Sequence, residues 1–187
     1  MNSRVVCYLL GLGLLAAAPA AHAQGITYDC DTAAGHFSEL TLPAGSVPFT
    51  VSGKVKLNAT AKDKTYIPST KLIIADATET GQPADVYAGF TLGVLPLDPK
   101  KAPAGRSAVQ ILGFSVNGKD DEILPKSLEV QLGTVQPFRL TYDGSTVAVT
   151  LGDESRNFSV KASKPIVRLI CSTGEFLYTD LQIVAGR

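Results

Sequence analysis

The sequence predicts an all-β protein. Apolar and polar residues alternate with a period of two through most of the chain, turn residues recur at short intervals, and helical periodicity is almost absent. The alternating segments amount to roughly ten to twelve short strands, which is typical of an antiparallel β-sandwich or barrel. Residues 24–187 are enough to bury one core, so a single domain is expected there.

The first 23 residues have the pattern of a secretory signal peptide. A basic start ending at Arg4 precedes an apolar run over Val5–Ala18 and a small-x-small cleavage site, Ala21-His22-Ala23. The run is shorter than the ~20 residues of a membrane-spanning helix, and no later segment is apolar enough to span. We therefore expect residues 1–23 to be removed and the mature chain, without a membrane span, to be secreted or periplasmic.

Charge gives no sign of a polyanionic partner. The chain has 17 basic and 17 acidic residues, so loss of Arg4 with the signal leaves a net charge of −1. This balance does not favour nucleic acid or an anionic membrane as partner. The chain has no tryptophan, and its mature part keeps one histidine, His36. One histidine cannot form a multi-histidine zinc or iron site.

Five strands are expected in the first half of the mature chain, over residues 26–30, 37–42, 49–57, 71–77 and 85–95. Gly53 interrupts the third strand and is expected to mark a β-bulge. The fourth strand contains three consecutive apolar residues, Leu72 to Ile74, which indicates burial on both faces. Residues 96–105 are rich in proline and are expected to form a long surface loop, either a plain connector or a functional one.

The second half contains two hairpin signals. Strands expected over 108–116 and 122–124 flank Asn117-Gly118, and strands over 138–142 and 147–151 flank Asp143-Gly144. We expect a type I′ turn at Asp143-Gly144. Its register would place four apolar residues on one buried face: Phe138, Leu140, Val147 and Val149. Further strands are expected over 128–132, 158–160, and on both sides of a Ser-Thr-Gly turn between 166 and 184.

Two cysteines, Cys30 and Cys171, remain after the signal is removed. An isolated pair in an oxidising compartment is usually a disulfide, and two free, buried thiols are the alternative. A bridge would make the first and last strands neighbours. The enclosed loop is long, so the chain-entropy model gives roughly 4–5 kcal/mol of stabilisation as an upper estimate.

The order of features resembles the concanavalin A-like jelly roll, the lectin, glucanase and laminin-G type of two-sheet sandwich. The hairpin Pro137-Phe-Arg-Leu-Thr-Tyr-Asp-Gly-Ser-Thr-Val-Ala-Val149 is similar to that family's Phe-x-Leu-x-Tyr-Asp-Gly-x-x-Val-x-Val pair. The segment Gly174–Ile183 is similar to its last strand, which lies beside the first. The resemblance implies a jelly roll over the mature chain, but the fold alone names no function.

The sequence favours a protein without catalytic residues. Glycosidases of this family carry Glu-x-Asp-x-Glu on one strand, where alternation places the carboxylates on one face, and no such triplet occurs here. The nearest pairs are Asp29 with Asp31 and Asp120 with Glu122, and neither is expected to act as an acid and nucleophile.

Other catalytic patterns also fail. Residues 113–119 match a phosphate-binding loop until Asp120 replaces its Ser or Thr, and a strand follows instead of a helix. The same segment lacks the last glycine of a serine-hydrolase elbow. His36 and Ser38 share a strand face, and we expect a surface histidine beside a serine rather than a catalytic pair.

The sequence does not exclude two kinds of ligand, calcium and sugar. Some laminin-G-like domains hold calcium in loops, and four aspartates are expected in loops here without ordered spacing: Asp98, Asp120, Asp121 and Asp153. Sugar-binding modules stack pyranose rings on exposed aromatics. Tyr142 and Tyr178 have the parity of core residues, whereas Tyr66 and Tyr87 are the expected exposed candidates for ligand binding.

These observations favour a secreted or periplasmic, non-catalytic β-sandwich that binds a glycan or another envelope component, without a cofactor. Two alternatives remain open. The protein is a structural or protein-interaction sandwich, or it is an enzyme acting on polysaccharide through residues that no motif identifies.

Overall fold

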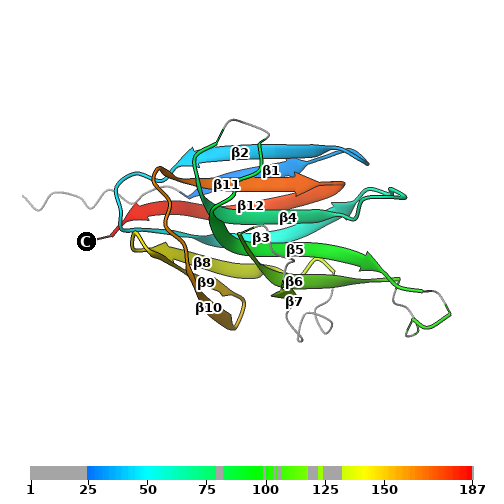
Figure 1. Ribbon diagram of the computed structural model, residues 1–187. Coiled ribbons are helices and arrows are strands. Elements are labelled where there is room, and N and C mark those ends of the chain that lie inside the picture. Colours follow the sequence, from blue (N-terminus) through cyan, green and yellow to red (C-terminus); the bar gives the residue numbers. More distant parts are fainter. Residues whose placement is uncertain are drawn as a thin grey trace, which may run out of the picture.

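Two antiparallel sheets of six strands each lie face to face in the computed structural model (Figure 1). It describes residues 25–78, 82–98, 100–102, 104, 107–117, 122–123 and 132–186. The all-β, two-sheet class expected from the sequence is confirmed. The expected signal peptide at 1–23, and most of the strand expected at 128–132, lie outside the described residues.

The first sheet contains both chain ends and has the order β1-β12-β3-β8-β9-β10. Its strands are β1 (Ile26–Asp31), β12 (Gly174–Ala185), β3 (Phe49–Thr60), β8 (Gln136–Tyr142), β9 (Thr146–Leu151) and β10 (Glu154–Ser159). The second sheet has the order β2-β11-β4-β5-β6-β7. Its strands are β2 (Phe37–Pro43), β11 (Pro165–Ser172), β4 (Ser69–Asp76), β5 (Tyr87–Pro96), β6 (Ala108–Val116) and β7 (Glu122–Ile123).

The core lies between the sheets and follows the alternation of the sequence. The face expected to be buried is buried: Phe138, Leu140, Val147 and Val149 are all in the core. Tyr142 and Tyr178 are fully buried as well, as their parity indicates. Rings meet across the sheets, with Phe90 of β5 5.2 Å from Phe138 of β8 between centroids.

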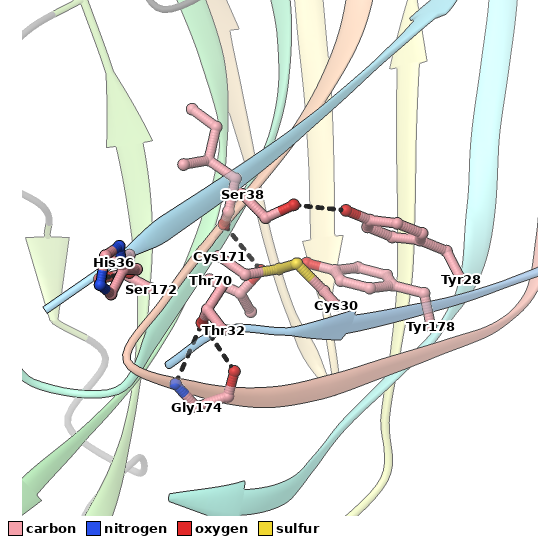
Figure 2. The surroundings of a disulfide bond; sticks show 11 residues. Tyr28, Cys30, Thr32, His36, Ser38, Thr70, Cys171, Ser172, Gly174 and Tyr178 are labelled. Carbon is pink, nitrogen blue, oxygen red and sulfur yellow. Dashed lines mark hydrogen bonds between the residues drawn. A yellow bond between two sulfur atoms is a disulfide. The ribbon is translucent and has the colours of Figure 1, made fainter. Parts of the chain in front are cut away.

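Cys30 and Cys171 form a disulfide, as expected, and it joins the two sheets (Figure 2). Cys30 is in β1 of the first sheet and Cys171 in β11 of the second, and both are buried. Beside the bond, the Tyr178 hydroxyl lies 2.7 Å from the Thr70 hydroxyl. Burial raises the pKa of the Tyr178 phenol above its usual 10.0, so it stays protonated.

The first and last strands are neighbours, with Ile26 opposite Leu181 and Cys30 opposite Phe176. The two strands around the Ser-Thr-Gly turn are not paired with each other: β11 is in the second sheet and β12 in the first. Thr173 makes this change of sheet with a positive φ of 57°. The alternation of the sequence shows two strands here but cannot show that they belong to different sheets.

The type I′ turn expected at Asp143-Gly144 is wrong. β8 and β9 do form a hairpin, but Tyr142 is opposite Val147 and three residues, 143–145, lie between the two strands instead of two. Gly144 has a φ of 107°, but Asp143 does not have the positive φ that a type I′ turn requires. Instead, the Asp143 carboxylate accepts hydrogen bonds from the backbone N–H groups of Ser145 and Thr146, both at 2.8 Å. These hydrogen bonds to the Asp143 side chain hold the turn, in place of the backbone hydrogen bonding of a two-residue turn.

The bulge expected at Gly53 lies on the partner strand. Lys54 is opposite Thr179 and Ser52 opposite Gln182, so the extra residue belongs to β12, and Asp180 there has a φ of 55°. A Cβ on Gly53 would lie 3.0 Å from the Thr179 carbonyl oxygen. Gly53 therefore marks the irregularity by making room for the bulged strand.

Candidate ligand-binding groove

The outward face of the second sheet carries the candidate site. Residues paired across neighbouring strands point to the same face. The register sets Ile170, Lys71, Thr91 and Gly113 side by side on β11, β4, β5 and β6. Leu72, which follows Lys71, is in the core, so the Lys71 row points outward, away from the first sheet.

Three depressions lie next to one another along this face and around its end, and neighbouring ones share a lining residue. Lys71 lines both the middle one, of about 240 Å³, and a second of about 310 Å³ that contains Tyr87. Ile67 lines the middle one and a third, of about 440 Å³, that contains Tyr66. We call the three together the outer groove. Other residues that line it are Ser69, Thr91, Gly93, Ile111, Asp63, Asp85 and Asn117.

Small residues of β5 face outward: Thr91 and Gly93 line the middle depression, and Gly89 lies buried beside it. A Cβ on Gly89 would overlap the carbonyl oxygen of Leu72, so only glycine permits this close approach of β4 and β5. A Cβ on Gly93 would have no atom nearer than 3.6 Å. The missing side chain at Gly93 thus leaves open space in the middle depression.

The connection from β4 to β5 forms one wall of the groove. Its described residues, 77–78 and 82–86, pass across the face of the second sheet (Figure 1). Arg168 of β11 holds it there: Nη1 donates to the carbonyl oxygen of Gln82 at 2.9 Å and to the Thr78 hydroxyl at 3.1 Å. Ala84 packs on Ile73 and so covers part of the sheet.

Tyr66 lies at the other end of the groove, and its ring is exposed (57%). The Asp63 carboxylate accepts hydrogen bonds from the backbone N–H groups of Tyr66, at 2.8 Å, and Thr65, at 2.7 Å. These bonds hold the pKa of Asp63 below its usual 3.8. Asp63 is therefore ionised near neutral pH and fixes the backbone that presents the ring.

Tyr87 is half-buried, because its ring packs against the small cluster of Ile73, Ala75 and Ala84. Its N–H donates to the side-chain oxygen of Asn117 at 2.9 Å. The two tyrosines expected to bind a ligand thus lie at opposite ends of one groove rather than in one pocket.

Lys71 and Arg168 are the groove residues that sequence reasoning missed. Lys71 donates to the Ser115 hydroxyl at 3.2 Å. Lys71 comes from a strand expected to be buried on both faces, and alternation cannot show which outward face is hollowed. One signal existed: Arg168 stands inside the apolar run Ile166–Ile170, where a charged residue needs a buried partner.

The other residues considered from the sequence do not converge. Asp29 and Asp31 are exposed on the edge strand β1, and neither lines a described depression. His36 is exposed, whereas the Ser38 hydroxyl lies 3.2 Å from that of Tyr28 (Figure 2). The Asp98 carboxylate accepts a hydrogen bond from the backbone N–H of Lys100.

Metal ligands do not gather in the described part of the chain. No three His, Cys, Asp or Glu side chains there are grouped closely enough to hold an ion. Asp120 and Asp121 lie outside the described residues, and so does the side chain of Glu122. Within the same described part, no helix has the length and apolar character needed to cross a membrane.

No protein-family model matches the chain, and no curated protein matches it. Solved structures do match at low identity. An alginate lyase from Alteromonas sp. 272 has a TM-score of 0.48 and 10% identity, over 73% of this chain and 71% of the lyase. The galectin LEC-6 of Caenorhabditis elegans has a TM-score of 0.44 and 7% identity, over 83% of this chain and 95% of the galectin.

A toad ovary galectin, in complex with thio-digalactose, has a TM-score of 0.41 and 10% identity, over 86% of this chain and 99% of the galectin. These proteins are concanavalin A-like sandwiches, the family that the sequence resembles. At these identities and scores the likeness is one of fold and says nothing about what the outer groove binds.

Proposed function

We propose that the protein is a secreted or periplasmic, non-catalytic β-sandwich that binds a glycan, or another envelope component, in the outer groove. The observation that carries the proposal is the composition of that groove. Aromatic rings stand at its two ends, Tyr66 and Tyr87, and hydrogen-bonding side chains lie between them, among them Ser69, Lys71 and Thr91. Sugars need both, because the ring faces stack on aromatics and the hydroxyls exchange hydrogen bonds.

The dimensions of the groove favour an extended ligand. Tyr87 and Gly93 are six positions apart on β5, which corresponds to about 20 Å at ~3.3 Å per residue. Tyr66 lies beyond Gly93, in the end depression. A linear chain of several sugar units matches this length better than a compact molecule does.

The carboxylates of the groove support a binding role rather than hydrolysis. Asp63 lines the depression at the Tyr66 end and Asp85 the one at the Tyr87 end. A glycosidase needs two carboxyl groups about 5 to 9.5 Å apart, whereas these two stand at opposite ends of the groove. The proposal therefore involves no acid–nucleophile pair and no cofactor.

The location is part of the proposal. A buried disulfide that joins the two sheets is compatible with an oxidising compartment. The signal-peptide pattern of residues 1–23 points to the same place.

A glycan array on the mature protein, followed by titration with β-glucan, xylan and galactan, tests the proposal. We expect Tyr66→Ala to weaken binding about tenfold, since stacking contributes about 1.4 kcal/mol. Phe37→Ala is the matched control, because Phe37 is an exposed aromatic (67%) that does not line the groove.

Each contrary result has a defined meaning. Absence of glycan binding, together with a dimer or larger assembly in light scattering, would favour the protein-interaction alternative. Release of reducing ends from any of the three polysaccharides, abolished by Asp85→Asn, would show that the protein is an enzyme.

A further inference from the structure

The middle depression of the outer groove is built around Gly93 of β5. In the same row, Ser69 of β4 lies on one side of Gly93 and Ile111 of β6 on the other. Both of these side chains are half-buried, whereas Gly93 is buried and still lines the depression. Gly93 therefore forms a floor below its two neighbours. We call the position of its missing side chain the Gly93 slot.

The Gly93 slot has room for a methyl group. A carbon atom at the Cβ position of Gly93 would have three nearest neighbours: the Pro68 carbonyl oxygen at 3.6 Å, Ile67 Cδ1 at 3.7 Å and Ile111 Cδ1 at 3.8 Å. These are ordinary van der Waals distances, so a carbon atom there gains contacts without overlap. Two of the three neighbours are methyl groups, which makes the slot largely apolar.

A hydroxyl group does not suit the Gly93 slot. An oxygen atom at this position would lie 3.6 Å from the Pro68 carbonyl oxygen, which is longer than the roughly 2.5–3.0 Å of an O–H···O hydrogen bond. The same carbonyl oxygen already accepts a hydrogen bond from the N–H of Val94 at 2.9 Å. A sugar hydroxyl there would lose its water without a replacement, which costs free energy. The slot therefore favours a methyl group over a hydroxyl group.

Polar side chains stand beside this apolar slot. Ser69 is opposite Gly93, and Thr91 is two residues before Gly93 on the same face of β5. The Thr91 hydroxyl donates to the carbonyl oxygen of Thr70 at 3.4 Å, so it meets a ligand as an acceptor, whereas the Ser69 hydroxyl can donate. An acetamido group matches all three features, because it has a methyl end, a carbonyl oxygen that accepts and an N–H that donates.

We infer that the outer groove recognises a sugar that carries an N-acetyl group; the inference names the ligand class of the proposed function and rests on it. The acetyl methyl lies in the Gly93 slot. Its carbonyl oxygen accepts a hydrogen bond from Ser69, and its N–H donates to Thr91. The planar amide carries the methyl group away from the sugar ring, so the ring itself stays above Ser69 and Ile111.

A matched pair of oligosaccharides tests this inference. Chitohexaose and cellohexaose have the same linkage and differ only in one group on each sugar, which is an acetamido group in the first and a hydroxyl group in the second. Calorimetric titration of the mature protein with each gives two dissociation constants. We expect chitohexaose to bind about tenfold more tightly or better, because burial of the methyl group and the amide hydrogen bonds both favour it.

Gly93→Ala fills the slot with a methyl group of the protein itself. We expect the variant to fold, as urea melts will show, and to lose the preference, so that the ratio of the two dissociation constants falls to about one. Ser52→Thr is the matched control. It adds one methyl group at a half-buried position of the first sheet, opposite Arg139 and outside the groove, and should keep the ratio of the parent.

The contrary results separate the inference from the proposed function. Equal binding of the two oligosaccharides, or binding of another glycan and of neither of these, would overturn N-acetyl recognition and leave glycan binding standing. An unchanged preference in folded Gly93→Ala would overturn the placement of the methyl group at Gly93. Failure of every glycan to bind would overturn both the inference and the proposed function.

Discussion

Arg168 on β11 and Glu39 on β2 form a buried, bidentate ion pair. Nε lies 3.0 Å from Oε1 and Nη2 2.6 Å from Oε2, and the side chains are only 3% and 7% exposed. The remaining nitrogen, Nη1, binds Thr78 and Gln82. One guanidinium therefore connects the sheet edge to the wall of the outer groove.

Removing one partner of this pair should strongly destabilise the protein. Glu39→Ala leaves the Arg168 charge buried and uncompensated, and we expect a loss of about 3–5 kcal/mol in urea unfolding. The control is Lys54→Ala, which breaks the pair with Asp180, whose side chains are 53% and 63% exposed. That exposed pair should contribute only about 0–1 kcal/mol. Equal effects of the two substitutions would contradict the buried pair.

Two glycines on β5 should respond differently to one methyl group. Gly89→Ala places a Cβ against the backbone of Leu72 and Ile73, and we expect about 3 kcal/mol of destabilisation from overpacking. Gly93→Ala meets only ordinary van der Waals contacts and should change the unfolding free energy by less than about 1 kcal/mol. Urea melts of both variants check this, and a tolerated Gly89→Ala would show that the strands are not this close.

The Cys30–Cys171 bond should be present in secreted material and should stabilise it. The bond spans 141 residues, for which the chain-entropy model gives about 4–5 kcal/mol as an upper estimate. Mass spectrometry with and without alkylation checks the bond, and urea melts of Cys30→Ser/Cys171→Ser check its effect. Two alkylatable thiols in native, oxidised protein would count against it.

Asp143 should make stability depend on pH at the acid end. The N–H groups of Ser145 and Thr146, followed by the Ser145 hydroxyl, hold its pKa below the usual 3.8. A lowered folded-state pKa gives stability that is present above 3.8 and is lost as pH falls through the folded-state value. We expect Asp143→Asn to be less stable than the parent at pH 7, with the difference shrinking below pH 3.8. A constant difference from pH 7 to pH 2 would contradict this.

Much of the fold could be predicted because alternation reports directly on burial. It identified the faces of β8 and β9, the buried Tyr142 and Tyr178, and the strands that carry the disulfide. Strand partners could not be predicted, since parity does not distinguish a neighbour in one sheet from a strand in the other. For this reason the sequence predicted β11 and β12 as two strands around one turn but did not show that they lie in different sheets.

The site was predictable only in part. Tyr66 and Tyr87 were expected to be exposed, in contrast to Tyr142 and Tyr178 with their core parity, and both line the groove. The groove itself depends on how β11, β4, β5 and β6 align, and on a connection that folds back over them. Neither is encoded in a local pattern. The prediction of a type I′ turn at Asp143-Gly144 was wrong for a related reason. The Asp143 side chain accepts the hydrogen bonds of the Ser145 and Thr146 N–H groups, and the residue pair alone does not show this.

The position of β12 constrains the order in which the molecule is assembled. This strand lies between β1 and β3, so Ile26 has no strand partner until Leu181 is available, and Val55, which also pairs with Gln136 of β8, lacks its partner on the other side until Tyr178 is available. A chain that lacks β12 cannot complete the first sheet, because the facing edges of β1 and β3 stay unpaired. β12 must therefore be available before the first sheet closes, and until then the chain exposes unpaired strand edges.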